Sequence, residues 1–188
     1  MHLPVGLGTD RREINGWLLT FSLFIFALKH FLFPCHFMIS NFFPILLLLH
    51  SLLRWFVLLA GVAALTGCFL GLTGKRPFAP LGRILGLIYV SVLDTQVLVG
   101  ILLSFASPLV RALWADPAVG MKNHDLRFFA VEHTVVMLLA LTLAHIGAVK
   151  SRKSKDAAKA YTVALTWYAL SFLVILTGIP WWRPLLRL

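Results

Sequence analysis

Charged residues are scarce in this sequence, and acidic ones most of all. Only 13% of the 188 residues are charged and just seven are Asp or Glu, whereas soluble domains carry about 25% charged residues. Hydrophobic residues make up 60%, and the mean hydropathy is +0.89. A soluble globule of this size cannot hide so much apolar surface, because roughly 30% of its unfolded surface stays wet. The excess of apolar residues also excludes disorder, so the composition indicates an integral membrane protein.

Cysteine and the common catalytic motifs are missing or nearly so. The two cysteines, Cys35 and Cys68, do not form a CxxC pair, so we expect no disulfide framework. The sequence contains no phosphate-binding glycine loop, GxSxG, HExxH or EF-hand pattern. The net charge of +10 would suggest nucleic-acid binding in a soluble protein. Here the basic residues fall mainly between apolar runs, so we expect a lipid bilayer and no nucleic acid as partner.

Four apolar runs are long enough to cross a membrane, which takes about 20 residues as a helix. They span residues 43–72, 84–105, 128–149 and 161–179. None alternates apolar with polar residues, as the strands of a membrane barrel would. The predicted fold is therefore all-α, an integral membrane bundle of four transmembrane helices.

Residues 14–33 are a fifth apolar run, interrupted by Lys29 and His30. We divide the chain into an N-terminal extension, 1–37, and a four-helix transmembrane domain, 38–188. The extension is either an extra transmembrane helix or the product of a mis-called start, with translation beginning at Met38. A cleaved signal peptide is a third alternative.

The loops set the orientation in the membrane. Residues 73–83 and 150–160 lie on one side and hold eight lysines and arginines, while the opposite side holds five. Because cytoplasmic loops are enriched in Lys and Arg, we expect 73–83 and 150–160 to be cytoplasmic.

Several ionisable residues lie inside the apolar runs, where they are costly and mark functional sites by default. They are His50, Arg54, Asp94, Glu132, His133 and His145. A helix rises about 1.5 Å per residue, which places His50, Arg54, Asp94, Glu132 and His133 in the outer half of the bundle. We expect Arg54 to pair with Asp94 or Glu132.

The two histidines at matching depth, His50 and His133, could ligate one haem b iron from opposite faces. In that arrangement Arg54 would face a haem propionate. The structural alternative is that the histidines bond to backbone or headgroups and that Arg54 only neutralises a carboxylate. His145 is twelve residues from His133, on another face of the helix, so we expect an interfacial histidine rather than a ligand of a second haem.

Five segments resemble a small bacterial four-helix membrane family whose members are labelled cytochrome b-like. They are LHSLLRW at 49–55, GKRPF at 74–78, LRFFAVEH at 126–133, DAAK at 156–159 and GIPW at 178–181. The resemblance covers residues 42–182 and implies a bacterial inner membrane location, with His50 and His133 as the matching histidines. The family carries a His-x-Gln motif where this chain has Asp94, and often a proline where it has Thr134.

Three functions remain open from the sequence. The first is a cytochrome b-like electron carrier acting with quinone or another membrane redox subunit. The second is a non-enzymatic structural or anchoring subunit of a larger complex. The third is a small proton-coupled transporter with a relay through Asp94, Glu132 and His133. We expect an electron-transfer or structural protein rather than an enzyme.

Overall fold

Four long helices form most of the chain in the computed structural model, which describes residues 42–78 and 80–184. All four are long and apolar enough to cross a membrane once the third is taken with the short turns before it. This confirms the predicted fold class, with element ends close to the predicted ones. The helices are α2 (Phe43–Thr73), α3 (Leu81–Ala106), α7 (His133–Lys153) and α8 (Ala157–Gly178).

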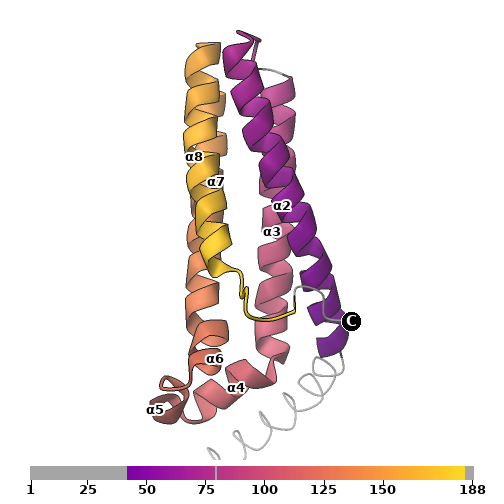
Figure 1. Cartoon of the computed structure of the whole chain (residues 1–188), viewed down its shortest axis with the longest axis vertical. Coiled ribbons are helices and arrows are strands. Elements are labelled where there is room, and N and C mark those ends of the chain that lie inside the picture. The colour runs from indigo at the N-terminus through magenta and orange to yellow at the C-terminus, as the bar shows by residue number, and fades with distance from the viewer. Residues whose placement is uncertain (1–41, 79, 185–188) are drawn as a thin grey trace, which may run out of the picture. The chain divides into compact units, whose positions relative to one another are not determined.

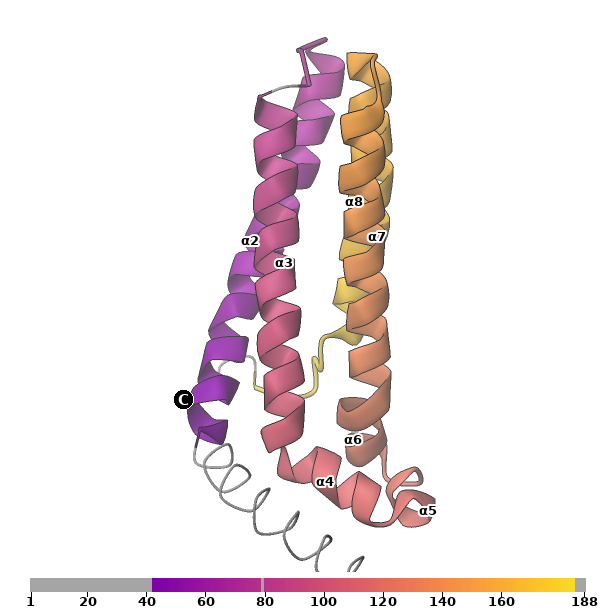
Figure 2. The same cartoon turned by 180° about the vertical axis from the view of Figure 1, so that it is seen from behind.

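The four helices run alternately up and down, and each packs against two neighbours. Helix α2 contacts α3 and α8, and α7 likewise contacts α3 and α8, so α2 and α7 are diagonal. Figures 1 and 2 show the α2–α3 and α7–α8 connections at the same end of the bundle. The predicted basic loops 73–83 and 150–160 therefore lie on one side, as the alternating topology requires.

Short helices close the opposite end between α3 and α7. They are α4 (Pro108–Ala115), α5 (Pro117–Gly120), α6 (His124–Arg127) and a π-helical turn, η1 (Phe128–Glu132). Three of them begin at polar caps, in which the side chains of Ser107, Asp116 and Asn123 accept a backbone N–H from the first turn. These caps explain why the chain turns here rather than continuing α3.

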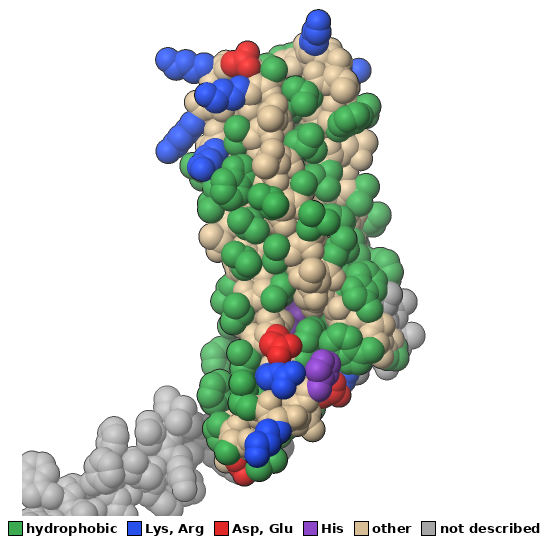
Figure 3. All heavy atoms as spheres, turned by 60° about the vertical axis from the view of Figure 1, so that its left-hand side comes forward, with side chains coloured by type: hydrophobic (Ala, Val, Ile, Leu, Met, Phe, Trp, Pro, Cys, Tyr) green, Lys and Arg blue, Asp and Glu red, His purple; other side chains and the backbone are tan. Residues whose placement is uncertain are grey.

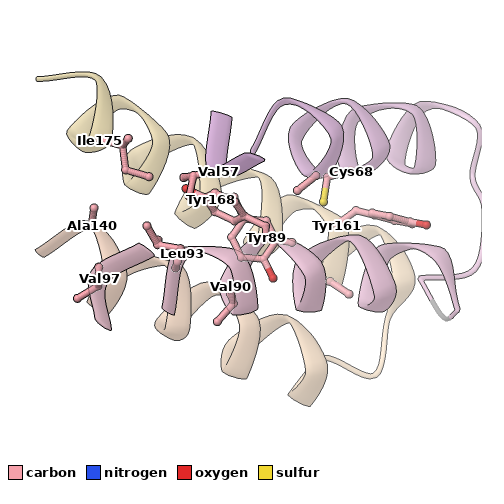
Figure 4. Packing of buried hydrophobic residues seen from close by; sticks show 14 of the residues in the cluster. Val57, Cys68, Tyr89, Val90, Leu93, Val97, Ala140, Tyr161, Tyr168 and Ile175 are labelled. Carbon is pink, nitrogen blue, oxygen red and sulfur yellow. The ribbon is translucent and has the colours of Figure 1, made fainter. Parts of the chain in front are cut away.

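Aromatic rings and small residues fill the centre of the bundle (Figure 4). The rings of Tyr89 and Tyr168 meet edge to face with centroids 5.5 Å apart. The Tyr89 hydroxyl lies 2.9 Å from Ser171 Oγ, and Ser171 donates to the carbonyl of Ala140 at 2.8 Å. This chain of hydrogen bonds links α3, α8 and α7, which is how buried polar groups join helices in a membrane.

Glycine allows close helix contact at Gly147, where a Cβ atom would lie 2.7 Å from Trp167 Cβ. Any larger side chain there would force α7 and α8 apart.

The outer surface matches a membrane protein. Apolar side chains cover the middle of the face shown in Figure 3, and Lys and Arg gather at the end that carries the α7–α8 connection. Phe42–Leu188 form one compact unit by their backbone contacts. The predicted extension 1–37 and the apolar run 14–33 lie outside the described residues.

Candidate functional site

A cavity of about 140 Å³ lies between the four long helices, in the half of the bundle that α4 closes. Helix α2 diverges from α8 toward its N-terminal end, as Figure 1 shows, and the cavity occupies this wider part. Its walls are mainly apolar. The nitrogen-bearing side chains in its lining are His50, Arg54, Gln96, His133 and Arg183.

Gln96 of α3 holds His50 of α2 in place. Its amide nitrogen Nε2 donates to the His50 carbonyl at 3.0 Å and lies 3.2 Å from His50 Nε2. The other ring nitrogen, His50 Nδ1, is buried with no hydrogen-bond partner among the described residues. Gly100 makes room for this imidazole, because a Cβ atom there would lie 3.0 Å from His50 Cε1.

His133 is oriented by the end of α8. Its Nδ1 lies 2.8 Å from the carbonyl oxygen of Gly178, one of the final carbonyls that a helix leaves without an internal partner. Since a carbonyl only accepts, Nδ1 carries the proton and Nε2 keeps its lone pair. Histidines that ligate metals usually donate their other ring nitrogen to a carbonyl or carboxylate in this way.

The two imidazoles meet across the diagonal of the bundle. Their ring centroids are 6.1 Å apart with an interplanar angle of 74°. Both rings line the main cavity and also a smaller cavity of about 40 Å³ between α3 and α7. Open space therefore lies against the histidine pair in two places, and the predicted meeting of His50 and His133 at one depth is what the structure contains.

The pair fits the donor set of a bis-imidazole haem. Two nitrogens on one metal, each about 2 Å from it, lie about 4 Å apart, which rings with this centroid spacing permit. Among the described residues no group of three or more His, Cys, Asp and Glu could hold a metal ion. Two histidines alone suit an iron whose other four ligands come from a porphyrin.

Two features of the site must change for a haem to enter. A cavity near 150 Å³ accommodates benzene, so the 140 Å³ present here is smaller than a porphyrin. A haem would fit only if the cavity widened around the two imidazoles. If His50 were to ligate through Nδ1, the ring proton would have to lie on Nε2. Gln96 would then have to turn its amide so that Oε1 accepts the Nε2 proton. Gln96 Oε1, which is buried without a partner, would gain a hydrogen bond in that turn, and the bond to the His50 carbonyl would be lost.

The predicted pairing of Arg54 with Asp94 or Glu132 is not the one the structure contains. Arg54 lines the histidine cavity, while Glu132 accepts from Arg127 at 2.5 Å. The π-helical turn explains the contact between Arg127 and Glu132, because residues five apart in the sequence come together in a π-helix. Sequence reasoning assumed an ordinary α-helix there and so missed Arg127.

Asp94 is also placed differently from the prediction. It accepts a hydrogen bond from His145 Nε2 at 2.8 Å, away from the outer cluster. Residues two apart on a helix point about 200° apart, so Gln96 faces His50 while Asp94 faces α7. His145, which was expected to be an interfacial histidine, thus has Asp94 as its partner, and it lies on a different face of the helix from His133, as predicted.

Arg183 is a member of the site that the sequence did not single out. It lines the cavity beside Arg54, forms an ion pair with Asp125 and lies over the Phe129 ring, 4.5 Å from its centroid. Residues 179–184 thus border the end of the cavity that α4 also closes. The only signal in the sequence is the position of Arg183, directly after the interfacial pair Trp181–Trp182.

Comparisons with protein families, with curated proteins and with solved structures find no match to this chain.

Proposed function

We propose that this protein is a cytochrome b-like membrane electron carrier in which His50 and His133 ligate one haem b. The observation that carries the proposal is the meeting of two imidazoles from diagonal helices, with centroids 6.1 Å apart, in a shared cavity. Bundle cores commonly form cofactor sites from side chains on facing helices. A haem with both axial positions filled would exchange single electrons and leave no position for oxygen.

The residues around the pair have separate tasks in this account. The Gly178 carbonyl fixes the His133 tautomer, so that Nε2 is presented to the cavity. Gln96 and Gly100 position the His50 ring. Arg54 and Arg183, which line the same cavity, would bind propionates, since a planar guanidinium matches a carboxylate. The apolar walls keep water from the iron and so help set its potential.

The proposal extends to the location of the carrier and to its electron-transfer partners. We propose a bacterial inner membrane location with loops 73–83 and 150–160 in the cytoplasm. Electrons would come from, or go to, quinone or another membrane redox subunit. The second candidate function is a non-enzymatic structural or anchoring subunit of a larger complex, favoured by the cavity of about 140 Å³, which is smaller than a porphyrin.

The haem content of the purified protein separates these two functions. Protein from haem-replete cells should carry one haem b per chain, measured as its pyridine complex. His50→Ala and His133→Ala should each lower this content more than about tenfold, because each removes a metal ligand. His145→Ala is the matched control and should leave it unchanged. A wild-type protein that purifies without haem and does not take up added hemin would favour the structural subunit.

A further inference from the structure

The Asp94–His145 pair lies on the outside of the bundle, near the middle of α3. The side chains are 44% and 50% exposed, respectively. They line a groove between α3 and α7 whose volume is about 170 Å³ and whose other polar lining residues are Arg83, Ser91, Ser151, Arg152 and Tyr168. In a bilayer that covers the apolar middle of the bundle, acyl chains would border this face. Ionisable residues inside a membrane almost always face a bundle interior or a water-filled cavity instead.

The pair satisfies only half of its own hydrogen-bonding capacity. One Asp94 oxygen accepts from His145 Nε2, and within the described residues the second oxygen and His145 Nδ1 have no hydrogen-bond partner. Polar groups left without partners in an apolar medium destabilise a structure strongly. A covering partner that supplies one acceptor and one donor at this depth would remove that cost.

We propose that this face is the dimer interface of the protein and that a second copy of the chain covers it. A two-fold axis along the membrane normal would set α3 of each copy against α7 of the other. Both copies would then keep the same orientation in the membrane, as their common loop charges require. Interfaces of this kind are self-complementary, with residue i meeting j and j meeting i.

The chemistry of the pair favours a second copy over a different partner. Asp94 and His145 are hydrogen-bonded to each other, so they lie at one depth. A two-fold axis along the membrane normal therefore places Asp94 of each copy opposite His145 of the other. The second carboxylate oxygen of each Asp94 then lies beside Nδ1 of the other copy's His145, so that the four side chains form one polar cluster. A partner of another sequence would have to supply both groups at that same depth.

The outward face of α2 carries no comparable pair of ionisable side chains. The outward side chains there are large and apolar, including Phe56, Leu59 and Val62, and they need only lipid. The dimer proposal uses neither His50 nor His133, so it stands independently of haem binding.

The test is subunit counting by single-molecule photobleaching of the full chain in vesicles of phosphatidylethanolamine and phosphatidylglycerol. Wild-type protein should be dimeric at low density. Asp94→Leu and His145→Leu should each weaken dimerisation about tenfold or more, since replacing either residue in both copies removes both Asp94–His145 contacts across the interface. Leu59→Ala, on α2, is the control and should dimerise like wild type. Asp94→Asn keeps the shape of the side chain and removes its charge. It should also weaken dimerisation while leaving the helix content, measured by circular dichroism, unchanged.

Mixing the two single variants decides whether the contacts cross between copies. A dimer of one Asp94→Leu chain and one His145→Leu chain retains a histidine on the first and an aspartate on the second. Differently labelled chains should therefore form mixed dimers in excess over either variant with itself. Wild-type monomers at all densities would overturn the proposal, as would variants that dimerise like wild type or mixed chains that show no preference.

Discussion

The imidazoles of His50 and His133 lie with their centroids 6.1 Å apart although they come from α2 and α7, which are diagonal in the bundle. The two side chains reach across the centre of the widened half, where the neighbouring helices leave space. Gln96 fixes one ring from α3 and Gly178 fixes the other from α8. All four long helices therefore take part in a single site.

Gln96→Leu should impair this site without unfolding the protein. The amide is the only hydrogen-bond partner of the His50 ring nitrogens among the described residues, and Leu has nearly the same volume. We expect hemin affinity to fall by about tenfold, in line with the 10–100-fold effects of outer-shell partners at metal sites. Titration of purified protein with hemin, followed by absorbance, measures it. Equal affinities for variant and wild type would show that Gln96 does not orient a ligand.

Arg54→Gln should weaken hemin binding more than it weakens the fold. A charge-assisted bond to a propionate is worth about 1.5–3 kcal/mol, which corresponds to roughly 10–100-fold in affinity. Arg111→Gln, in α4 and outside the cavity lining, is the control and should bind like wild type. The same loss with hemin dimethyl ester, which lacks the carboxylates, would contradict a propionate contact.

The hydrogen bonds of Ser171 should contribute measurably to stability. Ser171→Ala removes the partner of Tyr89 and the donor to Ala140, and Tyr89→Phe removes only the first. Interhelical hydrogen bonds in membrane proteins average about 0.6 kcal/mol, so we expect about 1 kcal/mol for Ser171→Ala and about half of that for Tyr89→Phe. Unfolding in mixed micelles with increasing dodecyl sulfate gives both values. Fully additive effects in the double variant would show that the two residues do not interact.

The basic loops should face the cytoplasm. In a Cys35→Ser background, Ser154→Cys should resist a membrane-impermeant maleimide applied to intact cells, while Val119→Cys, which is exposed at the other end of the bundle, should react. Cys68 is buried, so it should not react, and labelling of the background protein measures any nonspecific reaction. Efficient labelling at position 154 together with protection at 119 would reverse the orientation.

The fold could be predicted from the sequence because membrane helices obey one simple constraint. Every backbone polar group must be satisfied within the helix, so apolar length alone located α2, α3 and α8 to within a few residues. Matching depth along the helices also put His50 and His133 at one level of the bundle. The same arithmetic says nothing about which way a side chain points.

The pairing of charges could not be predicted for that reason. Asp94 was expected among the outer residues but faces α7, where His145 meets it. Glu132 was expected near Arg54 but turns to Arg127, because the π turn changes the angular spacing between them. Arg183 joins the cavity only through the path of the C-terminal segment, which local sequence patterns do not encode. Distances and relative angles along one helix were readable, but which face of a helix meets which neighbour was not.

Haem ligation by this histidine pair is tested most directly by ligand replacement and rescue. His133→Gly protein should lose the low-spin bis-imidazole spectrum of dithionite-reduced, hemin-loaded wild type, and added imidazole should restore it by filling the space that the side chain leaves. His145→Gly with and without imidazole should match wild type throughout. A wild-type protein without a low-spin spectrum, or a His133→Gly variant that retains one before imidazole is added, would contradict the account.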